Sequence, residues 1–223
     1  MSVENSLQQQ FTFVEKITAG VTHDMNNVLA VINEYSGLLE DQIYLAENGA
    51  QLNLDKLQSI SERLSNQVVR GRNLMKSLNK FAHETDQNVS AFDLNEMLEN
   101  LILLCNRFAL AQQIELKSNS TNSKIVIVHK AFALKQLVFN VLITLFEQIN
   151  SPSEILVSSI PNGSQTKIVI ELHPNSSTLS IDNFSIFDES AEKLSVLIEY
   201  HFSDADASID LLLPNNFNNP QDL

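Results

Sequence analysis

The 223-residue sequence predicts an α+β chain in which a long antiparallel helical hairpin is followed by a small α/β sandwich. Two observations support this class. Apolar residues recur at helical spacing as far as the polar run at 83–90, and short β-rich runs alternate with helices after it. We expect a hairpin domain over 1–86, an α/β domain over 91–216 and a frayed tail over 217–223.

The first helix is expected over about residues 8–46, where apolar residues follow steps of three and four. This stripe consists of Val14, Ile17, Val21, Met25, Val28, Ile32, Tyr35 and Leu39. The turn signal at 47–50 separates it from a second periodic segment over 54–81. Two long helices joined by a short turn predict an antiparallel hairpin. Because one hairpin cannot cover both stripes, we expect a homodimer whose hairpins form a four-helix bundle.

The second domain is expected to open with a short extended piece that runs into a helix over 94–111, capped near Asp93 or Asn95. Helices are also predicted over 131–149 and 189–202. Strands are predicted over 114–117, 125–128, 154–158, 166–171 and 207–213, with a weaker run over 178–181. Helices combined with mostly antiparallel strands favour a sandwich with the helices on one face of a sheet.

Charge and composition exclude several classes of function. The net charge of −13 disfavours direct binding to nucleic acid or to anionic membranes. No apolar run approaches the roughly 20 residues that span a bilayer, so we expect a cytoplasmic protein without a membrane anchor. Cys105 is the single cysteine, which excludes an internal disulfide. Basic residues concentrate between Glu62 and Lys80, where they form either a solvated face or a docking surface for an acidic partner.

The segment GVTHDMNNVLA, residues 20–30, places a histidine, an acid and two amides in the first helix. An ideal helix turns about 100° per residue, which puts His23 nearly opposite the apolar stripe, Asn27 on the same side and Asp24 at the margin. One interpretation is a solvated surface histidine. The other is chemical: imidazole attacks phosphorus well, a carboxylate fixes its tautomer, and an amide can hold a water or a phosphoryl oxygen. Without a second histidine at ligand spacing, no metal site is expected.

Three motifs occur in the order found in sensor histidine kinases. His23-Asp24-x-Asn26-Asn27-x-Leu29 resembles their phosphoacceptor box. Residues 70–82 resemble the return helix of the kinase hairpin for dimerisation and phosphotransfer, and residues 92–96 resemble the start of the ATP-binding domain. The resemblance covers nearly the whole chain and is strongest over residues 11–110.

The motifs that bind ATP in that family are missing or altered. Residues 134–144 resemble the helix of the N-box; Asn140 matches its first asparagine, but Thr144 stands where a second asparagine helps hold magnesium. The chain has five glycines and none after Gly163, so both glycine loops of the nucleotide site are absent. Three later segments resemble the flanks of a deleted nucleotide lid and the closing strand: 186–188, 194–201 and 209–214. No bound ATP and no ATP-dependent kinase activity are expected.

The resemblance therefore implies a histidine phosphotransferase of a bacterial phosphorelay, with a degenerate ATPase-like domain. His23 would carry a phosphoryl group between aspartates of response regulator receiver domains. Asp24 would orient or activate the imidazole, and Asn27 would contact the phosphoryl group or a water. The receiver would supply magnesium, while Arg63 and Arg70 would help dock it.

The same residues are compatible with two other functions. An acid directly after the histidine and an amide one turn later, as in Asp24 and Asn27, also resemble the motif with which kinases of this type dephosphorylate receivers. The chain would then be a receiver-domain phosphatase. A dimeric pseudokinase scaffold that binds a receiver or a kinase without moving phosphate is the second alternative.

Overall fold

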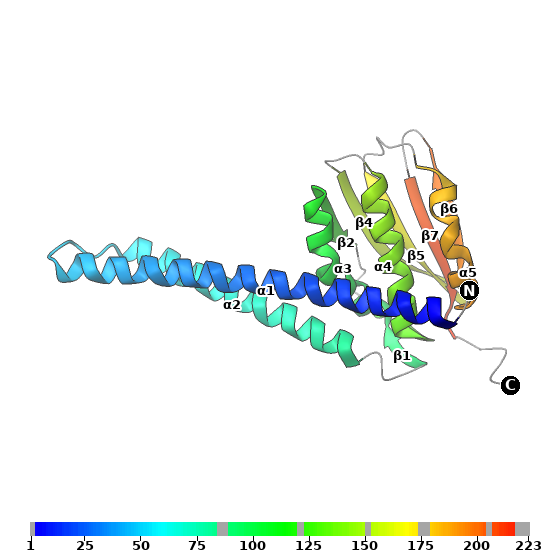
Figure 1. Ribbon diagram of the computed structural model, residues 1–223, viewed down its shortest axis with the longest axis horizontal. Coiled ribbons are helices and arrows are strands. Elements are labelled where there is room, and N and C mark those ends of the chain that lie inside the picture. The colour runs from blue at the N-terminus through cyan, green and yellow to red at the C-terminus, as the bar shows by residue number, and fades with distance from the viewer. Residues whose placement is uncertain are drawn as a thin grey trace.

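The computed structural model describes residues 3–83, 89–119, 123–149, 153–173, 179–203 and 207–216. Helix α1 (Val3–Glu47) and helix α2 (Leu54–His83) form a long antiparallel hairpin, and an α/β domain packs against its base (Figure 1). The predicted fold class is confirmed. The expected tail over 217–223 and most of the expected linker lie outside the described residues.

A short turn reverses the chain between the two long helices. Gly49 takes a left-handed conformation at φ +87°, which glycine adopts without strain, just after α1 ends. Asn53 then caps α2, because its side-chain oxygen accepts a hydrogen bond from the Lys56 amide at 3.0 Å. Across the hairpin, Gly71 lies so close to Val28 that an added Cβ would sit 3.2 Å from a valine methyl. This contact fixes which residues of α1 and α2 lie level.

The α/β domain contains two sheets. Strands β2, β4, β5, β7 and β6 form a five-stranded sheet in that order, in which β2 and β4 are parallel and the other neighbours antiparallel. Strands β1 and β3 form a small antiparallel pair. The element bounds are β1 Ser90–Asp93, α3 Leu94–Ala111, β2 Ile114–Ser118, β3 Val126–His129, α4 Ala131–Gln148, β4 Ser153–Asn162, β5 Gln165–His173, α5 Asp188–Glu192, β6 Leu197–Phe202 and β7 Ala207–Pro214.

Two sequence predictions in this domain are wrong. The helix expected over 189–202 is only α5, after which Ser195 turns the chain at φ 54° and β6 begins. An apolar run of this length is compatible with a strand or a helix. Here Leu197–Phe202 forms a strand because it pairs with β7. A 3₁₀ turn at Ile181–Asn183 takes the place of the end of the strand expected over 178–181; Thr178 lies outside the described residues.

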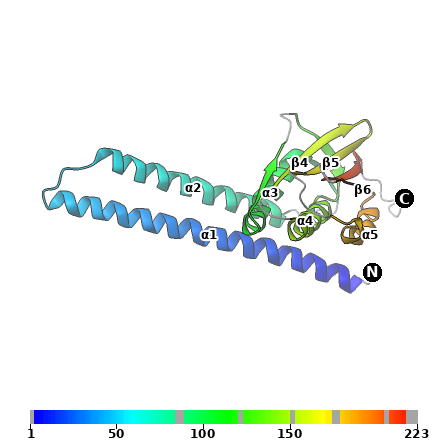
Figure 2. The ribbon, with the colours of Figure 1, turned by 90° about the horizontal axis from the view of Figure 1, so that it is seen from above.

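Helices α3 and α4 cover one face of the large sheet, and the base of the hairpin packs on these helices (Figure 2). An aromatic cluster joins the two parts: Phe13 of α1 lies 5.2 Å from Phe81 of α2 and 4.8 Å from Phe139 of α4, measured between ring centroids. Phe132 of α4 lies 5.5 Å from Phe13. The hairpin and the α/β domain therefore share one hydrophobic core.

None of the helices in the described ranges combines the length and the apolar character that crossing a membrane requires.

Candidate functional site

His23 lies on the exposed side of α1, with 51% of its side chain accessible to solvent. Val21 and Val28, which flank it in sequence, are buried in the core. The helical phase predicted for His23 is thus what the structure shows. The opposite face of α1 packs into the hydrophobic core through Val21 and Val28. The helix therefore presents the His23 imidazole to solvent.

Both predicted neighbours of His23 approach the same ring nitrogen. The Asn27 amide nitrogen lies 3.2 Å from Nδ1, and the nearer Asp24 carboxylate oxygen lies 3.7 Å from it. Asn27 reaches Nδ1 because residues four apart are neighbours on a helix surface. Asp24 is mostly buried, with a side chain 15% exposed, so its carboxylate has little freedom to turn away.

Nε2 is the nitrogen left with a lone pair when the ring carries its proton on Nδ1. A carboxylate beside Nδ1 favours the tautomer that carries its proton there. Asn27 accommodates that tautomer when its amide oxygen, in place of its nitrogen, faces the ring. The Nε2 lone pair is then available as a nucleophile on the solvent side of the ring.

The two predicted docking arginines lie at different distances from His23. Arg63 stacks over the Tyr35 ring, with its guanidinium carbon 5.7 Å from the ring centroid. Tyr35 is twelve residues beyond His23, which is about 18 Å along the helix axis. Arg70 is exposed and precedes Gly71, which packs on Val28, so it lies about a turn and a half from the level of His23. The structure does not bring Arg63 to the histidine.

The contact between Gly71 and Val28 shows a basic residue that sequence analysis did not single out. Counting five residues from each contact partner toward the base places Lys76 level with His23. Lys76 is exposed and lines a groove between α2 and α3 together with Lys80, which pairs with Glu96 at 2.8 Å. Counting from the middle of the turn at 47–50 pairs His23 with Leu74, two residues from Lys76, so the turn alone gives only the approximate level.

The residue that resembles the first N-box asparagine, Asn140, lies beside a small cavity. Asn140 of α4 lines a cavity of about 150 Å³, small beside the roughly 300 Å³ or more of typical ligand pockets. Gln9 and Gln10, from the start of α1, form one wall of it. Lys193 and Leu194, which follow α5, form another. The lining thus combines α4 with a helix that belongs to the hairpin.

Hydrogen bonds hold the segments before and after α5 in place. The Leu194 carbonyl accepts a hydrogen bond at 2.9 Å from Nε2 of the buried His129. The Tyr200 hydroxyl lies 3.0 Å from both the Phe184 carbonyl and a carboxylate oxygen of Asp188. Burial and the neighbouring Asp188 raise the pKa of Tyr200, so the phenol keeps its proton and its role as a donor. These bonds hold the segment against the sheet.

Comparisons with known proteins identify the fold. No family model and no curated protein sequence matches the chain. The catalytic domain of the histidine kinase ThkA matches 58% of this chain and 97% of that domain, with a TM-score of 0.51 and 12% identity. Histidine kinase AdeS of Acinetobacter baumannii matches 81% of this chain and 94% of that one, with a TM-score of 0.48 and 12% identity. The match to the ThkA catalytic domain shows that this part of the chain has a histidine-kinase-like fold.

Proposed function

We propose that the chain is a dimeric histidine phosphotransferase of two-component signalling, which passes a phosphoryl group between aspartates of response regulator receiver domains through His23. The observation that supports this most directly is the exposed imidazole whose Nδ1 faces both Asp24 and Asn27. These two neighbours can orient the imidazole and fix its tautomer, as a phosphoacceptor requires.

The transfer would be an in-line displacement at phosphorus. The Nε2 lone pair of His23 forms a bond to phosphorus while the bond from phosphorus to the aspartyl oxygen breaks, and the donor aspartate leaves as a carboxylate. The Nδ1 proton remains on the ring and is stabilised by Asp24. A carboxylate of the second receiver then attacks the same phosphorus and restores the neutral imidazole. The receiver would bring the magnesium that balances charge in both steps.

ATP is not part of this proposal. The chain has Thr144 where the resembled family has its second N-box asparagine, and no glycine after Gly163 that would let backbone amides approach phosphates. Gln9 and Gln10 line the cavity beside Asn140, which measures about 150 Å³. Saturable ATP binding in the micromolar range would contradict this part of the proposal.

A second copy of the chain would cover the exposed apolar side chains of the hairpin. From Leu29 to Arg70, the only buried residue is Ile60, although this stretch carries many apolar side chains. Leu29 is 57% exposed and Val68 is 48% exposed. An added Cβ on Gly37 would meet nothing within 4 Å. A bundle of two hairpins would bury these side chains, and burial of apolar surface is the main driving force for association.

Phosphotransfer from phosphorylated receivers tests the function. Purified chain, incubated with a panel of receiver domains carrying labelled phosphate, should acquire acid-labile label, and His23→Ala should acquire none because Nε2 is lost. His83→Ala, at the exposed end of α2, is the matched control and should be labelled like the wild type. A chain that takes no label from any receiver, or equal labelling of His23→Ala, would contradict the proposal.

The receiver-phosphatase alternative is supported by one specific observation. Asn27 is exposed beside the imidazole and can hold a water as readily as a phosphoryl oxygen. If hydrolysis is the main activity, Asn27→Ala should stop the release of inorganic phosphate while His23→Ala retains part of it. If transfer is the main activity, His23→Ala is the more damaging change. A pseudokinase scaffold would bind receivers equally well with either substitution and move no phosphate.

A further inference from the structure

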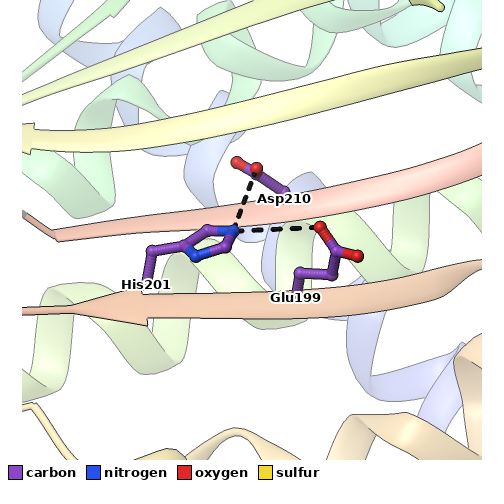
Figure 3. Close-up of side chains that lie close together, drawn as sticks. All are labelled: Glu199, His201 and Asp210. Atoms are coloured by element: carbon purple, nitrogen blue, oxygen red, sulfur yellow. Dashed lines mark ion pairs between the residues drawn. The ribbon is translucent and has the colours of Figure 1, made fainter.

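The face of the large sheet away from α3 and α4 carries a cluster of charged side chains near its β6 edge. Glu199 and His201 lie two residues apart on β6, so both point to the same side of the sheet. Asp210 of β7 pairs directly with Glu199 and points to that side as well. Figure 3 shows the three side chains converging from the two strands.

The distances within this cluster match the edges of a metal coordination shell. His201 Nε2 lies 3.3 Å from Asp210 Oδ2 and 3.8 Å from Glu199 Oε2. One ligand atom from each residue lies within 4.8 Å of the other two. Tetrahedral ligands about 2.0–2.2 Å from a zinc ion are about 3.3–3.6 Å apart. To reach that geometry, the partly exposed Glu199 side chain has to move closer, and the Lys167 ammonium has to leave Asp210 Oδ2.

Asp210 provides an independent indication that the cluster accommodates a ligand. Its side chain is 5% exposed, and its buried Oδ1 atom has no hydrogen-bond partner among the residues that the structure describes. Its other oxygen, Oδ2, lies 2.6 Å from the Lys167 ammonium on β5. A buried carboxylate oxygen that makes no bond is destabilising, because it has lost its water. A cation bound by both carboxylate oxygens of Asp210 would supply the missing interaction at Oδ1.

We propose that Glu199, His201 and Asp210 bind a first-row divalent transition cation, with Zn²⁺ as the representative. One imidazole and two carboxylates suit such an ion, and three protein ligands leave a coordination position open to water. Mg²⁺ requires a nearly octahedral set of oxygen ligands and is expected to bind poorly. Lys167 competes for Asp210, but its side chain is 30% exposed and can turn toward solvent. This site is independent of the proposed role of His23.

Zinc binding by the full chain tests this inference. Titration calorimetry with Zn²⁺ should show one saturable site per chain that Mg²⁺ does not occupy, and Co²⁺ should give the visible absorption of a protein-bound ion. His201→Ala and Glu199→Gln should each weaken Zn²⁺ binding at least tenfold. Lys167→Gln should bind Zn²⁺ more tightly, because the competing ammonium is gone. Absence of saturable binding, or tight binding retained by His201→Ala, would overturn the inference.

Matched histidine variants distinguish this cluster from other possible zinc ligands. His173→Ala, on the same face of the sheet, and His23→Ala, on the hairpin, should each bind Zn²⁺ like the wild type. Loss of binding in either variant would place the ion elsewhere and overturn the assignment. His201 is 55% exposed, so its alanine variant should fold normally, which far-ultraviolet circular dichroism can verify. The test therefore does not depend on substituting the buried Asp210.

Discussion

His129 shows how burial of a single side chain can couple the fold to pH. The residue ends β3, is fully buried, and donates from Nε2 to the Leu194 carbonyl at 2.9 Å. Burial disfavours the charged imidazolium and lowers the pKa of His129 below its ordinary value of 6.5. The hydrogen bonds to the backbone act in the opposite direction but do not compensate.

Folding should therefore weaken in mild acid. A folded-state pKa below the unfolded value means that the unfolded chain binds more protons, so the stability that neutral His129 contributes is present above pH 6.5 and is lost as pH falls through the lowered value. Each unit of lowering corresponds to about 1.4 kcal/mol. Urea unfolding at pH 7.5 and pH 5.5 should show this loss in the wild type, and a smaller loss in His129→Gln. An equal loss in both would contradict the assignment.

Local spacing explains which site residues could be predicted from the sequence. His23 and Asn27 are four residues apart, so helical phase alone places them side by side. Arg63 was assigned a docking role from charge, but its distance from His23 depends on how α1 and α2 align. Lys76 belongs to the same basic stretch, and its position level with His23 depends on that alignment too. Pairing between helices is a tertiary property, which residue type and charge do not encode.

Helix α1 is the element that joins the two parts of the molecule. At its base, Phe13 is 1% exposed and contacts rings from α2 and α4, while Gly20 lets the Phe108 ring of α3 approach to 3.4 Å from where a Cβ would stand. A Cβ at Gly20 would make ordinary van der Waals contact with that ring. The packing of α1 on the domain thus relies on buried aromatic rings, Phe13 above all.

Removal of the Phe13 ring should destabilise the whole chain. Truncating a buried phenylalanine to alanine generally costs about 3–5 kcal/mol, since it leaves a cavity and removes apolar contacts. Phe11→Ala is the matched control, because Phe11 lies two residues away on the same helix and is 68% exposed. Its effect should stay within about 0.5 kcal/mol. Similar losses in the two variants, measured by urea unfolding, would show that α1 does not dock through Phe13.

Elements with a strong local signal were predicted best. The helix expected over 94–111 is α3, Leu94–Ala111, and the predicted cap Asp93 accepts a hydrogen bond from the Asn95 amide at 3.1 Å. By contrast, β6 was assigned to a helix. It is an edge strand that pairs only with β7, so its identity depends on a partner distant from the local pattern. The cluster of Glu199, His201 and Asp210 was missed for the same reason, because it exists only once β6 and β7 align.

At the scale of the whole molecule, the exposed apolar residues of the hairpin determine the expected assembly. Size-exclusion chromatography with light scattering should give about twice the chain mass of 25.0 kDa for the wild type. Val68→Glu should shift the mass toward the monomer, because a charge would be buried between hairpins. Asn66→Glu adds the same charge two residues away, at an exposed polar position, and should leave the dimer intact. A monomeric wild type would contradict the proposed bundle.

The length of the hairpin beyond His23 has a consequence for any domain that reaches this histidine. The 24 residues from His23 to the end of α1 at Glu47 extend about 36 Å, slightly more than the roughly 30 Å width of a small domain. The α/β domain packs at the opposite end, around the base of the hairpin (Figure 1). A receiver domain bound at His23, as proposed, would therefore find a contact surface of about its own width along the outer hairpin. It would not have to displace the α/β domain.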